Sequence, residues 1–442
     1  MSSPFAIIEG DPSAPLFRRF RSDQGEHVLI VPHSRIFDLP GELTSSEDDQ
    51  ESISLFSALA QSAFGEEELD GVAAPSPQSI SLNVSSSCNL SCSYCYAARG
   101  SFQGAQPNPM SWQVAKGAVD RLFLEASSHS PITVGFLGGE PFVNRSLVHR
   151  VVEYASSKAL RRQLNVRFSV TTNGTLLNDA DLALIRNHQF AVTVSIDGGS
   201  QVQNQQRPAA NSAKASFDQL ITAAGQLVKN PGRAHVSARA TVKRGEFRLC
   251  ERFDDIVALG YEEAGFAPLR SSADGSALLD DDWPRYLDAM IEAAKPELDR
   301  ARQGLPIRLT NLAVALKQIH RGASSPYPCG AGGGYFSVSA SGEWYACHRA
   351  IGNSQFRLGD NDGLSSSLRN SFLIDRHVHS QAACRTCWAR YLCSGGCHQE
   401  ASSRSDSSCG FIRGWLDFCL ASYCELTAAV PDYFSDRTEA RL

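Results

Sequence analysis

Three closely spaced cysteines are the first residues of this sequence whose types and spacing could do chemistry. Cys88, Cys92 and Cys95 lie in the string CNLSCSYC with the spacing C-x3-C-x2-C. Structural zinc takes four ligands and disulfides form in pairs, so three thiols on one short loop suit neither arrangement. Each iron of a [4Fe–4S] cluster is normally held by one cysteine thiolate, so three thiolates leave one iron open to a small ligand. We interpret the loop as an iron–sulfur site, with a three-cysteine zinc site completed elsewhere as the alternative.

Most of the remaining cysteines lie near the C-terminal end. The chain has 13 cysteines, and nine of them occur in the strings CGAGGGYFSVSASGEWYAC (329–347), CRTCWARYLCSGGC (384–397) and CGFIRGWLDFCLASYC (409–424). In a reducing compartment, dense cysteine serves metal binding more often than disulfides. Cys250 stands alone in EFRLCERF, and we expect it to be buried as a small apolar residue.

Composition limits the classes of function. The 442 residues suffice for two or three domains, and 42% hydrophobic and 20% charged residues are ordinary for a globular protein. A net charge of 41 − 47 = −6 gives no basic field for nucleic acid. No apolar run is long enough to span a membrane, and the string MSSPFAIIEG lacks the features of a secretion signal. We expect a cytoplasmic protein with neither a nucleic-acid nor a membrane partner.

Strand and helix patterns alternate after residue 78. Alternating or apolar segments that end in glycine or polar residues predict six strands, at 79–86, 131–140, 165–174, 190–199, 234–243 and 262–270. Helical spacing of apolar residues predicts helices between them, at 111–126, 146–161, 179–188, 214–229 and 247–259. This order indicates a parallel α/β arrangement, in which chemistry takes place at the C-terminal ends of the strands. The three-cysteine loop directly follows the first of these strands.

The C-x3-C-x2-C loop resembles the signature of the radical S-adenosylmethionine (SAM) superfamily. The resemblance implies a partial (β/α)6 barrel whose open iron is chelated by the amino and carboxylate groups of SAM. Electron transfer then cleaves SAM to methionine and a 5′-deoxyadenosyl radical, which abstracts a hydrogen atom from the substrate. Tyr96, directly after Cys95, matches the aromatic residue that such enzymes place against adenine.

Three predicted strand ends resemble SAM-contacting motifs of the same superfamily. GGEP (138–141) supplies Gly138, Gly139 and Glu140, and the carboxylate of Glu140 is expected to accept hydrogen bonds from the SAM ammonium. The other expected SAM contacts are Asn173 in TTNG, Ser195 and Asp197 in SIDG, and Arg239, which could pair with the SAM carboxylate. TNG and DG also occur as ordinary turn sequences, and Arg239 also fits a structural ion pair.

The C-terminal cysteines resemble the seven-cysteine SPASM extension of radical SAM maturases, including Gly342 five positions before Cys347. This resemblance implies two auxiliary [4Fe–4S] clusters, and three clusters in the whole protein. One auxiliary cluster would take Cys329, Cys347 and Cys397, with either an open iron or an unusual ligand such as Cys419. The other would take Cys384, Cys387, Cys393 and a late cysteine, for which we prefer Cys409 over Cys419 and Cys424.

Three domains are expected: a small N-terminal subdomain (1–77), a radical SAM partial barrel (78–300) and an iron–sulfur SPASM domain (301–442). The string EHVLIVPHSRIFDL (26–39) predicts two short strands in the N-terminal subdomain. This subdomain either packs against the rest of the chain or recruits a substrate peptide by adding it to a sheet edge.

SPASM enzymes modify peptides or proteins, and three reactions compete here. The strings CHR, SGGCHQE and RGWLDFCL look most like the maturase of quinohemoprotein amine dehydrogenase, which joins cysteine sulfur to an Asp or Glu carbon in a small subunit. Other peptide crosslinks and formylglycine formation are the alternatives, but sulfatase-maturing enzymes generally have Asp where this chain has His348. His348 is a candidate general base. The resemblance implies a peptide or small protein subunit as substrate and a flavodoxin or ferredoxin as electron donor. The non-enzymatic alternative is an electron-transfer or zinc-stabilised binding protein.

Overall fold

The computed structural model describes residues 6–7, 13–40, 50–62, 71–72, 74–102, 108–211, 214–272, 274–322 and 324–435. The chain forms two compact units, each built from separate stretches of the sequence. The barrel unit comprises Ala74–Leu278 and Gly330–Phe372, and the auxiliary unit comprises Met1–Ala73, Leu279–Cys329 and Leu373–Leu442. The expected division into three domains, with boundaries at residues 77 and 300, stays a prediction.

The barrel unit is built on one sheet with the strand order β11-β10-β9-β8-β7-β6-β12-β13-β14-β15. The six strands from β6 to β11 are parallel neighbours, β12 adds parallel to β6, and β13, β14 and β15 follow antiparallel. Their bounds are β6 Ser79–Ser85, β7 Ile132–Gly138, β8 Val166–Thr172, β9 Phe190–Ser195, β10 His235–Val242, β11 Ala264–Pro268, β12 Tyr335–Val338, β13 Trp344–Tyr345, β14 Arg357–Asp360 and β15 Gly363–Leu364. This is the α/β radical SAM partial barrel that the sequence predicts.

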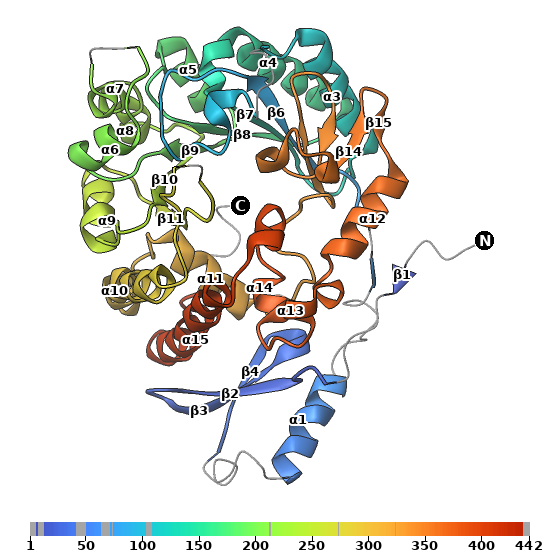
Figure 1. Cartoon of the computed structure of the whole chain (residues 1–442), viewed down its shortest axis with the longest axis vertical. Coiled ribbons are helices and arrows are strands. Elements are labelled where there is room, and N and C mark those ends of the chain that lie inside the picture. The colour runs from blue at the N-terminus through green and yellow to red at the C-terminus, as the bar shows by residue number, and fades with distance from the viewer. Residues whose placement is uncertain are drawn as a thin grey trace. The chain divides into compact units, whose positions relative to one another are not determined.

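Helices alternate with the parallel strands and cover one side of the sheet (Figure 1). Their bounds are α3 Trp112–Glu125, α4 Arg145–Arg162, α5 Asp179–Asn187, α6 Ser200–Gln206, α7 Ser216–Ala223, α8 Gly225–Lys229 and α9 Leu249–Ala258; α12 Ser366–Arg376 leads from the barrel unit to the C-terminal stretch. Side-chain caps fix two helix starts: Ser111 accepts from the Val114 N–H, and Asn178 forms a capping box with Asp181. Cys250 is exposed, so its expected burial was wrong: α9 buries Leu249, Phe253 and Ile256 instead.

The two faces of the parallel sheet differ in polarity. Phe136, Phe168 and Phe190 stack on one face, with the Phe168 and Phe190 ring centroids 5.3 Å apart. On the other face, a Cβ atom on Gly135 would lie 2.7 Å from Ser169 Oγ and 2.9 Å from Ser81 Oγ. Such alternation of apolar and polar residues follows from the two-residue period of a strand. One face therefore packs under helices, and polar side chains line the other.

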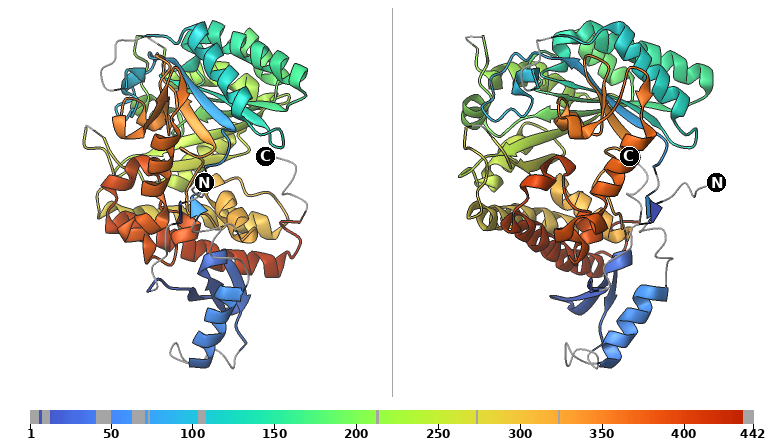
Figure 2. Two further views of the ribbon diagram at one scale, coloured as in Figure 1. Left: turned by 90° about the vertical axis from the view of Figure 1, so that its right-hand side faces the viewer. Right: turned by 45° about the vertical axis from the view of Figure 1, so that its right-hand side comes forward.

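The N-terminal part of the auxiliary unit contains a small antiparallel sheet in the order β2-β3-β4, with bounds Phe17–Ser22, Gly25–Ile30 and Arg35–Asp38. The expected strands within residues 26–39 are thereby confirmed. Helix α1 (Gln50–Ser62) lies beside this sheet (Figure 2), and Val28, Ile30, Phe56 and Ala60 form their shared core. A separate two-stranded pair joins β1 (Ala6–Ile7) and β5 (Gly71–Val72).

Three longer helices form the body of the auxiliary unit: α10 Asp282–Arg302, α11 Thr310–His320 and α15 Asp406–Ala429. Helix α15 packs on α10 through Phe411 and Tyr286, whose ring centroids lie 4.8 Å apart. Two short helices, α13 Ala382–Arg385 and α14 Arg390–Cys393, carry cysteines of the C-terminal field. Within the described residues, no helix is both long and apolar enough to cross a membrane.

Candidate active site

The three-cysteine loop follows β6 in the barrel unit. All three thiols are free and partly accessible, and they lie close enough together for Cys92 and Cys95 to act electrostatically on Cys88. Donors point at the sulfur atoms: Leu90 N–H lies 3.4 Å from Cys88 Sγ, and Arg99 N–H lies 3.4 Å from Cys95 Sγ. Such hydrogen bonds favour the thiolate form, which is the form that ligates iron. The residues present therefore fit a three-thiolate iron–sulfur site.

The spacing of these thiols differs from that of a mononuclear metal site. In the described part of the chain, no three His, Cys, Asp or Glu side chains converge closely enough to hold one metal ion. A zinc site needs such convergence, with every Zn–S distance near 2.3 Å. An iron–sulfur cluster is larger than one ion, and each of its thiolates binds a different iron.

Glu140 lies at the end of β7 and is completely buried. Its carboxylate accepts hydrogen bonds from Thr172 Oγ1 (2.7 Å), the Asn173 N–H (2.8 Å) and the Phe142 N–H (3.2 Å). Burial raises the pKa of Glu140 to about 7, against the opposing effect of these donors. A cationic partner, such as the ammonium group of SAM, would strongly stabilise the charged form of this buried carboxylate.

Asn173 connects Glu140 to the cysteine loop. Its backbone N–H binds Glu140, while its Nδ2 donates to Asn89 Oδ1 at 2.9 Å and lies 3.7 Å from Cys88 Sγ. The TTNG turn after β8 therefore acts on both the carboxylate and the thiol.

Gly138 and Gly139 permit close backbone approach. Gly138 has φ +144°, and a Cβ there would lie 2.3 Å from the Ser85 carbonyl oxygen. A Cβ on Gly139 would lie 2.3 Å from the Ser87 carbonyl oxygen. Both contacts are impossible for a larger residue, so the two glycines hold the end of β7 against the start of the cysteine loop.

Asp197, expected to contact SAM, forms a buried clasp with protein donors. Its carboxylate accepts from the hydroxyl of Tyr94, from Arg207 Nε and Nη2 at 2.9 and 3.2 Å, and from the Thr241 N–H at 2.8 Å. Tyr94 belongs to the cysteine loop, so the clasp attaches this loop to the sheet. Sequence reasoning missed Tyr94 and Arg207, although Tyr94 stands between two of the cysteines.

Ser195, the last residue of β9, is the cross-strand neighbour of Arg239 in the middle of β10. Arg239 is exposed, unlike Ala238 and Ala240, which point to the helix-covered face. The structure thus brings these two expected SAM contacts together on the polar face of the sheet.

Tyr96 and His348 lie beside each other in the barrel unit, with ring centroids 6.1 Å apart. The Arg349 guanidinium lies over the Tyr96 ring at 5.5 Å. His348 Nδ1 is hydrogen-bonded to the Tyr335 hydroxyl at 2.9 Å. Burial, followed by the charge of Arg349, lowers the pKa of His348 to about 4, so it is neutral at pH 7.

Comparison with known proteins supports the interpretation of this site as a radical SAM site. Residues 82–248 match the family model described as "Radical SAM superfamily". The chain is 24% identical over 364 residues to the "Serine-type anaerobic sulfatase-maturating enzyme" of Klebsiella aerogenes, covering 76% of this chain and 83% of that protein. Residues 82–248 thus form a radical SAM domain.

Solved structures share the fold of this chain. "Native anSMEcpe with bound AdoMet and Cp18Cys peptide" aligns with TM-score 0.65 at 19% identity and covers 80% of this chain and 100% of that chain. Streptococcus suis SuiB bound to its precursor peptide SuiA aligns with TM-score 0.52 at 13% identity, covering 81% of this chain and 78% of that chain. SAM and a [4Fe–4S] cluster are the expected cofactors of such an enzyme.

A second group of thiols lies in the auxiliary unit. Electrostatic interactions connect all four members, Cys384, Cys387, Cys393 and Cys409. Burial raises the pKa of Cys384 and Cys409, and that of Cys393 to about 11, while the charge of Arg404 opposes each shift. The four thiols form a donor set that fits one four-iron cluster.

The other expected auxiliary ligands are distributed differently. Cys329 and Cys397 are exposed residues of the auxiliary unit, and Cys347 belongs to the barrel unit. Cys419 is fully buried within α15, and burial alone raises its pKa. The described structure therefore does not bring Cys419 to the group of four thiols, whereas it does bring Cys409.

Proposed function

We propose that this protein is a radical SAM peptide maturase that forms intrapeptide thioether crosslinks between cysteine sulfur and an Asp or Glu carbon in a precursor peptide or small protein subunit. The observation that carries the proposal is the residue after Cys347. A sulfatase-type enzyme generally has an Asp base there, whereas this chain has His348, a neutral imidazole bound to Tyr335. No carboxylate base is available at this position, and the imidazole of His348 takes its place as the candidate base.

The atoms of the proposed reaction balance as follows. SAM and a cluster held by Cys88, Cys92 and Cys95 would supply the radical chemistry that removes one hydrogen atom from the substrate carbon. The substrate thiol loses its proton to a base, for which His348 is the candidate. The new C–S bond then forms with loss of one electron to an auxiliary centre. The peptide therefore loses two hydrogen atoms for each crosslink.

We assign the following roles within this proposal. Cys88, Cys92 and Cys95 hold the SAM-binding cluster; Glu140, Ser195 and Arg239 are the candidates for polar contacts to SAM. Two auxiliary clusters complete a total of three: Cys384, Cys387, Cys393 and Cys409 hold one, and Cys329, Cys347 and Cys397 hold the other. The proposed reductant is a flavodoxin or ferredoxin. Asp197 is also a candidate SAM contact, and it positions the cysteine loop through the protein donors that bind its carboxylate.

Mass spectrometry on the modified peptide tests the proposal. Anaerobic incubation of the reconstituted enzyme with SAM, dithionite and a candidate precursor peptide should remove two hydrogen atoms per site and consume one alkylatable thiol per site. A carbon–carbon crosslink would remove two hydrogen atoms but leave every thiol alkylatable. Conversion of Cys or Ser to formylglycine would favour the sulfatase-type reaction. The Cys88→Ala variant should produce neither 5′-deoxyadenosine nor product.

A further inference from the structure

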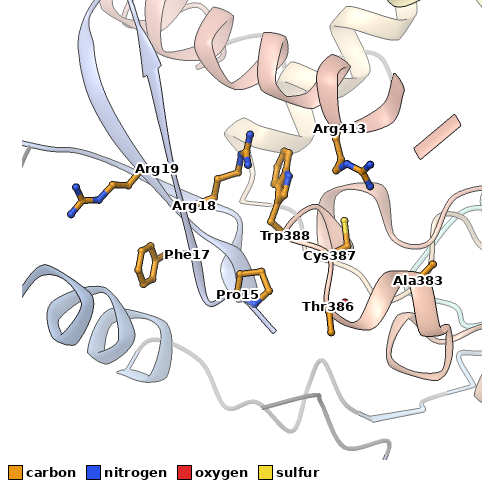
Figure 3. A pocket seen from close by; sticks show the side chains of 9 residues that line it. All are labelled: Pro15, Phe17, Arg18, Arg19, Ala383, Thr386, Cys387, Trp388 and Arg413. Atoms are coloured by element: carbon orange, nitrogen blue, oxygen red, sulfur yellow. The ribbon is translucent and has the colours of Figure 1, made fainter. Parts of the chain in front are cut away.

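A pocket of the auxiliary unit lies where strand β2 meets the cysteine-bearing segment around α13 (Figure 3). Its volume is about 610 Å³, within the range of roughly 300–1,000 Å³ typical of binding pockets. Phe17, Arg18 and Arg19 line it from β2, Cys387 and Trp388 from the loop after α13, and Arg413 from α15. None of the residues that line it is acidic.

The charges at the pocket favour a negatively charged occupant. Arg18 lies over the Trp388 ring at 4.2 Å and binds Asp417 through two hydrogen bonds of 3.0 and 2.8 Å, so its charge is largely balanced. Arg413 flanks Trp388 on the side away from Arg18 (Figure 3). The positive charge of Arg413 interacts electrostatically with Asp417 and with the Cys409 thiol. The pocket is thus a cationic region in a chain of net charge −6.

The same pocket reaches the group of four thiols. Cys387 is part of its wall, and Arg413 stands one helical turn after Cys409 on α15. A protein that covers this pocket would therefore contact a cluster ligand directly. Positive charge around such a contact steers an acidic partner to it and accelerates association.

We propose that this arginine pocket is the docking site for a small acidic electron-transfer protein of the flavodoxin or ferredoxin type. The inference rests on the proposed assignment of Cys387 and Cys409 as cluster ligands. One electron passes across the contact, so the flavin or iron–sulfur centre of the partner is oxidised by one electron. The centre held by the four thiols is reduced by one electron, and no proton or group is transferred.

Binding of a purified acidic flavodoxin to the reconstituted holoenzyme tests the proposal. Arg413→Glu should weaken binding roughly tenfold at low salt, because it reverses one charge at the contact. Asp417→Asn should strengthen binding several-fold, since it removes the acidic neighbour of the same pocket. Both differences should shrink at high ionic strength, where charge interactions are screened.

Arg248→Glu is the matched control, because Arg248 is an exposed arginine of the barrel unit that pairs with Glu251, three residues further along the chain. It should leave flavodoxin affinity unchanged. Stopped-flow reduction of the auxiliary centres by flavodoxin hydroquinone should be slowed in Arg413→Glu, whereas reduction by dithionite should not. Equal affinity of Arg413→Glu and the wild type, or equal weakening by Arg248→Glu, would overturn the proposal.

Two further outcomes separate this inference from the proposed function. Weakened binding of the precursor peptide to Arg413→Glu, with flavodoxin affinity unchanged, would make the pocket a substrate site and overturn the docking proposal. Iron and sulfide analysis of the same samples tests the ligand assignment independently. Loss of flavodoxin binding in Arg413→Glu would support docking even in a preparation that forms no crosslink.

Discussion

Arg404 Nη1 donates a hydrogen bond to the Sγ of Cys384 over 3.0 Å. The same guanidinium donates to the Gly395 carbonyl oxygen, which fixes its orientation. Its positive charge also opposes the burial-raised pKa values of Cys393 and Cys409. One arginine therefore stabilises negative charge on several thiols that are proposed to ligate one cluster.

Arg404→Gln should make the reduction potential of this auxiliary cluster more negative. Reduction adds negative charge, and the variant removes the positive charge and the hydrogen bond that favour it. A shift on the order of 50 mV corresponds to about sevenfold in a one-electron equilibrium. An EPR-monitored redox titration measures the shift, and Arg404→Lys, which retains the charge, should restore part of it. An unchanged potential in Arg404→Gln would contradict this role.

Glu140 should make the stability of the SAM-free protein depend on pH. Its pKa is about 7 in the fold and 4.5 in the unfolded chain, so the folded state binds the proton more tightly. The stability that this proton contributes is present below about pH 4.5 and is lost as the pH rises to 7. The full difference is on the order of 3 kcal/mol.

Urea unfolding of the SAM-free protein between pH 5 and pH 7.5 measures this dependence, and Glu140→Gln should flatten the slope. The variant also places an amide NH2 against the Asn173 N–H, so it should be less stable at every pH. The slope is therefore the informative quantity, and an identical slope in both proteins would refute the assignment.

The sequence predicts the architecture well, because the architecture depends on local patterns, whereas the cysteine ligand assignments stay predictions. Strands with two-residue periodicity and cysteines at fixed spacing carry their signal within short strings. Asp197 is different: SIDG indicates a polar residue at a strand end, but only the fold places Tyr94 and Arg207 around it. The division into two units could not be predicted from local sequence patterns, because contacts between segments far apart in the sequence define it.

The Asp197 clasp should be one of the most sensitive points of the barrel unit. Asp197→Asn leaves the buried guanidinium of Arg207 without its counter-charge, which typically costs about 3–5 kcal/mol. Tyr94→Phe removes one donor to the same carboxylate and should cost about 1 kcal/mol. Urea unfolding of Asp197→Asn, Arg207→Gln and the double variant forms a cycle. The double variant should lose less stability than the sum of the two single losses, and simple additivity would argue against the pairing.

Cys409 and Cys419 offer a matched test of the auxiliary cluster, because both belong to α15 and only Cys409 lies near the other thiols. Cys409→Ala should lower the iron content of the reconstituted enzyme by at least about one atom, because it removes the ligand of one iron of the cluster. Cys419→Ala should retain the iron and lose only packing stability. Loss of iron in Cys419→Ala alone would reverse the ligand assignment.

His348 should reveal its role in the pH dependence of crosslinking. With a pKa of about 4, the imidazole is already unprotonated at pH 6, so the wild-type rate should show no inflection from His348 between pH 6 and pH 8. If His348 accepts the thiol proton, His348→Asn should slow product formation by at least about a hundredfold at pH 7. The rate of the variant should then rise with pH toward the thiol pKa near 8.5, because the ionised thiol no longer needs a base. Tyr335→Phe is the control, since it removes only the hydrogen bond to Nδ1 and should slow the reaction less. A His348→Asn enzyme with the wild-type rate and a flat pH profile would leave His348 as a structural partner of Tyr335.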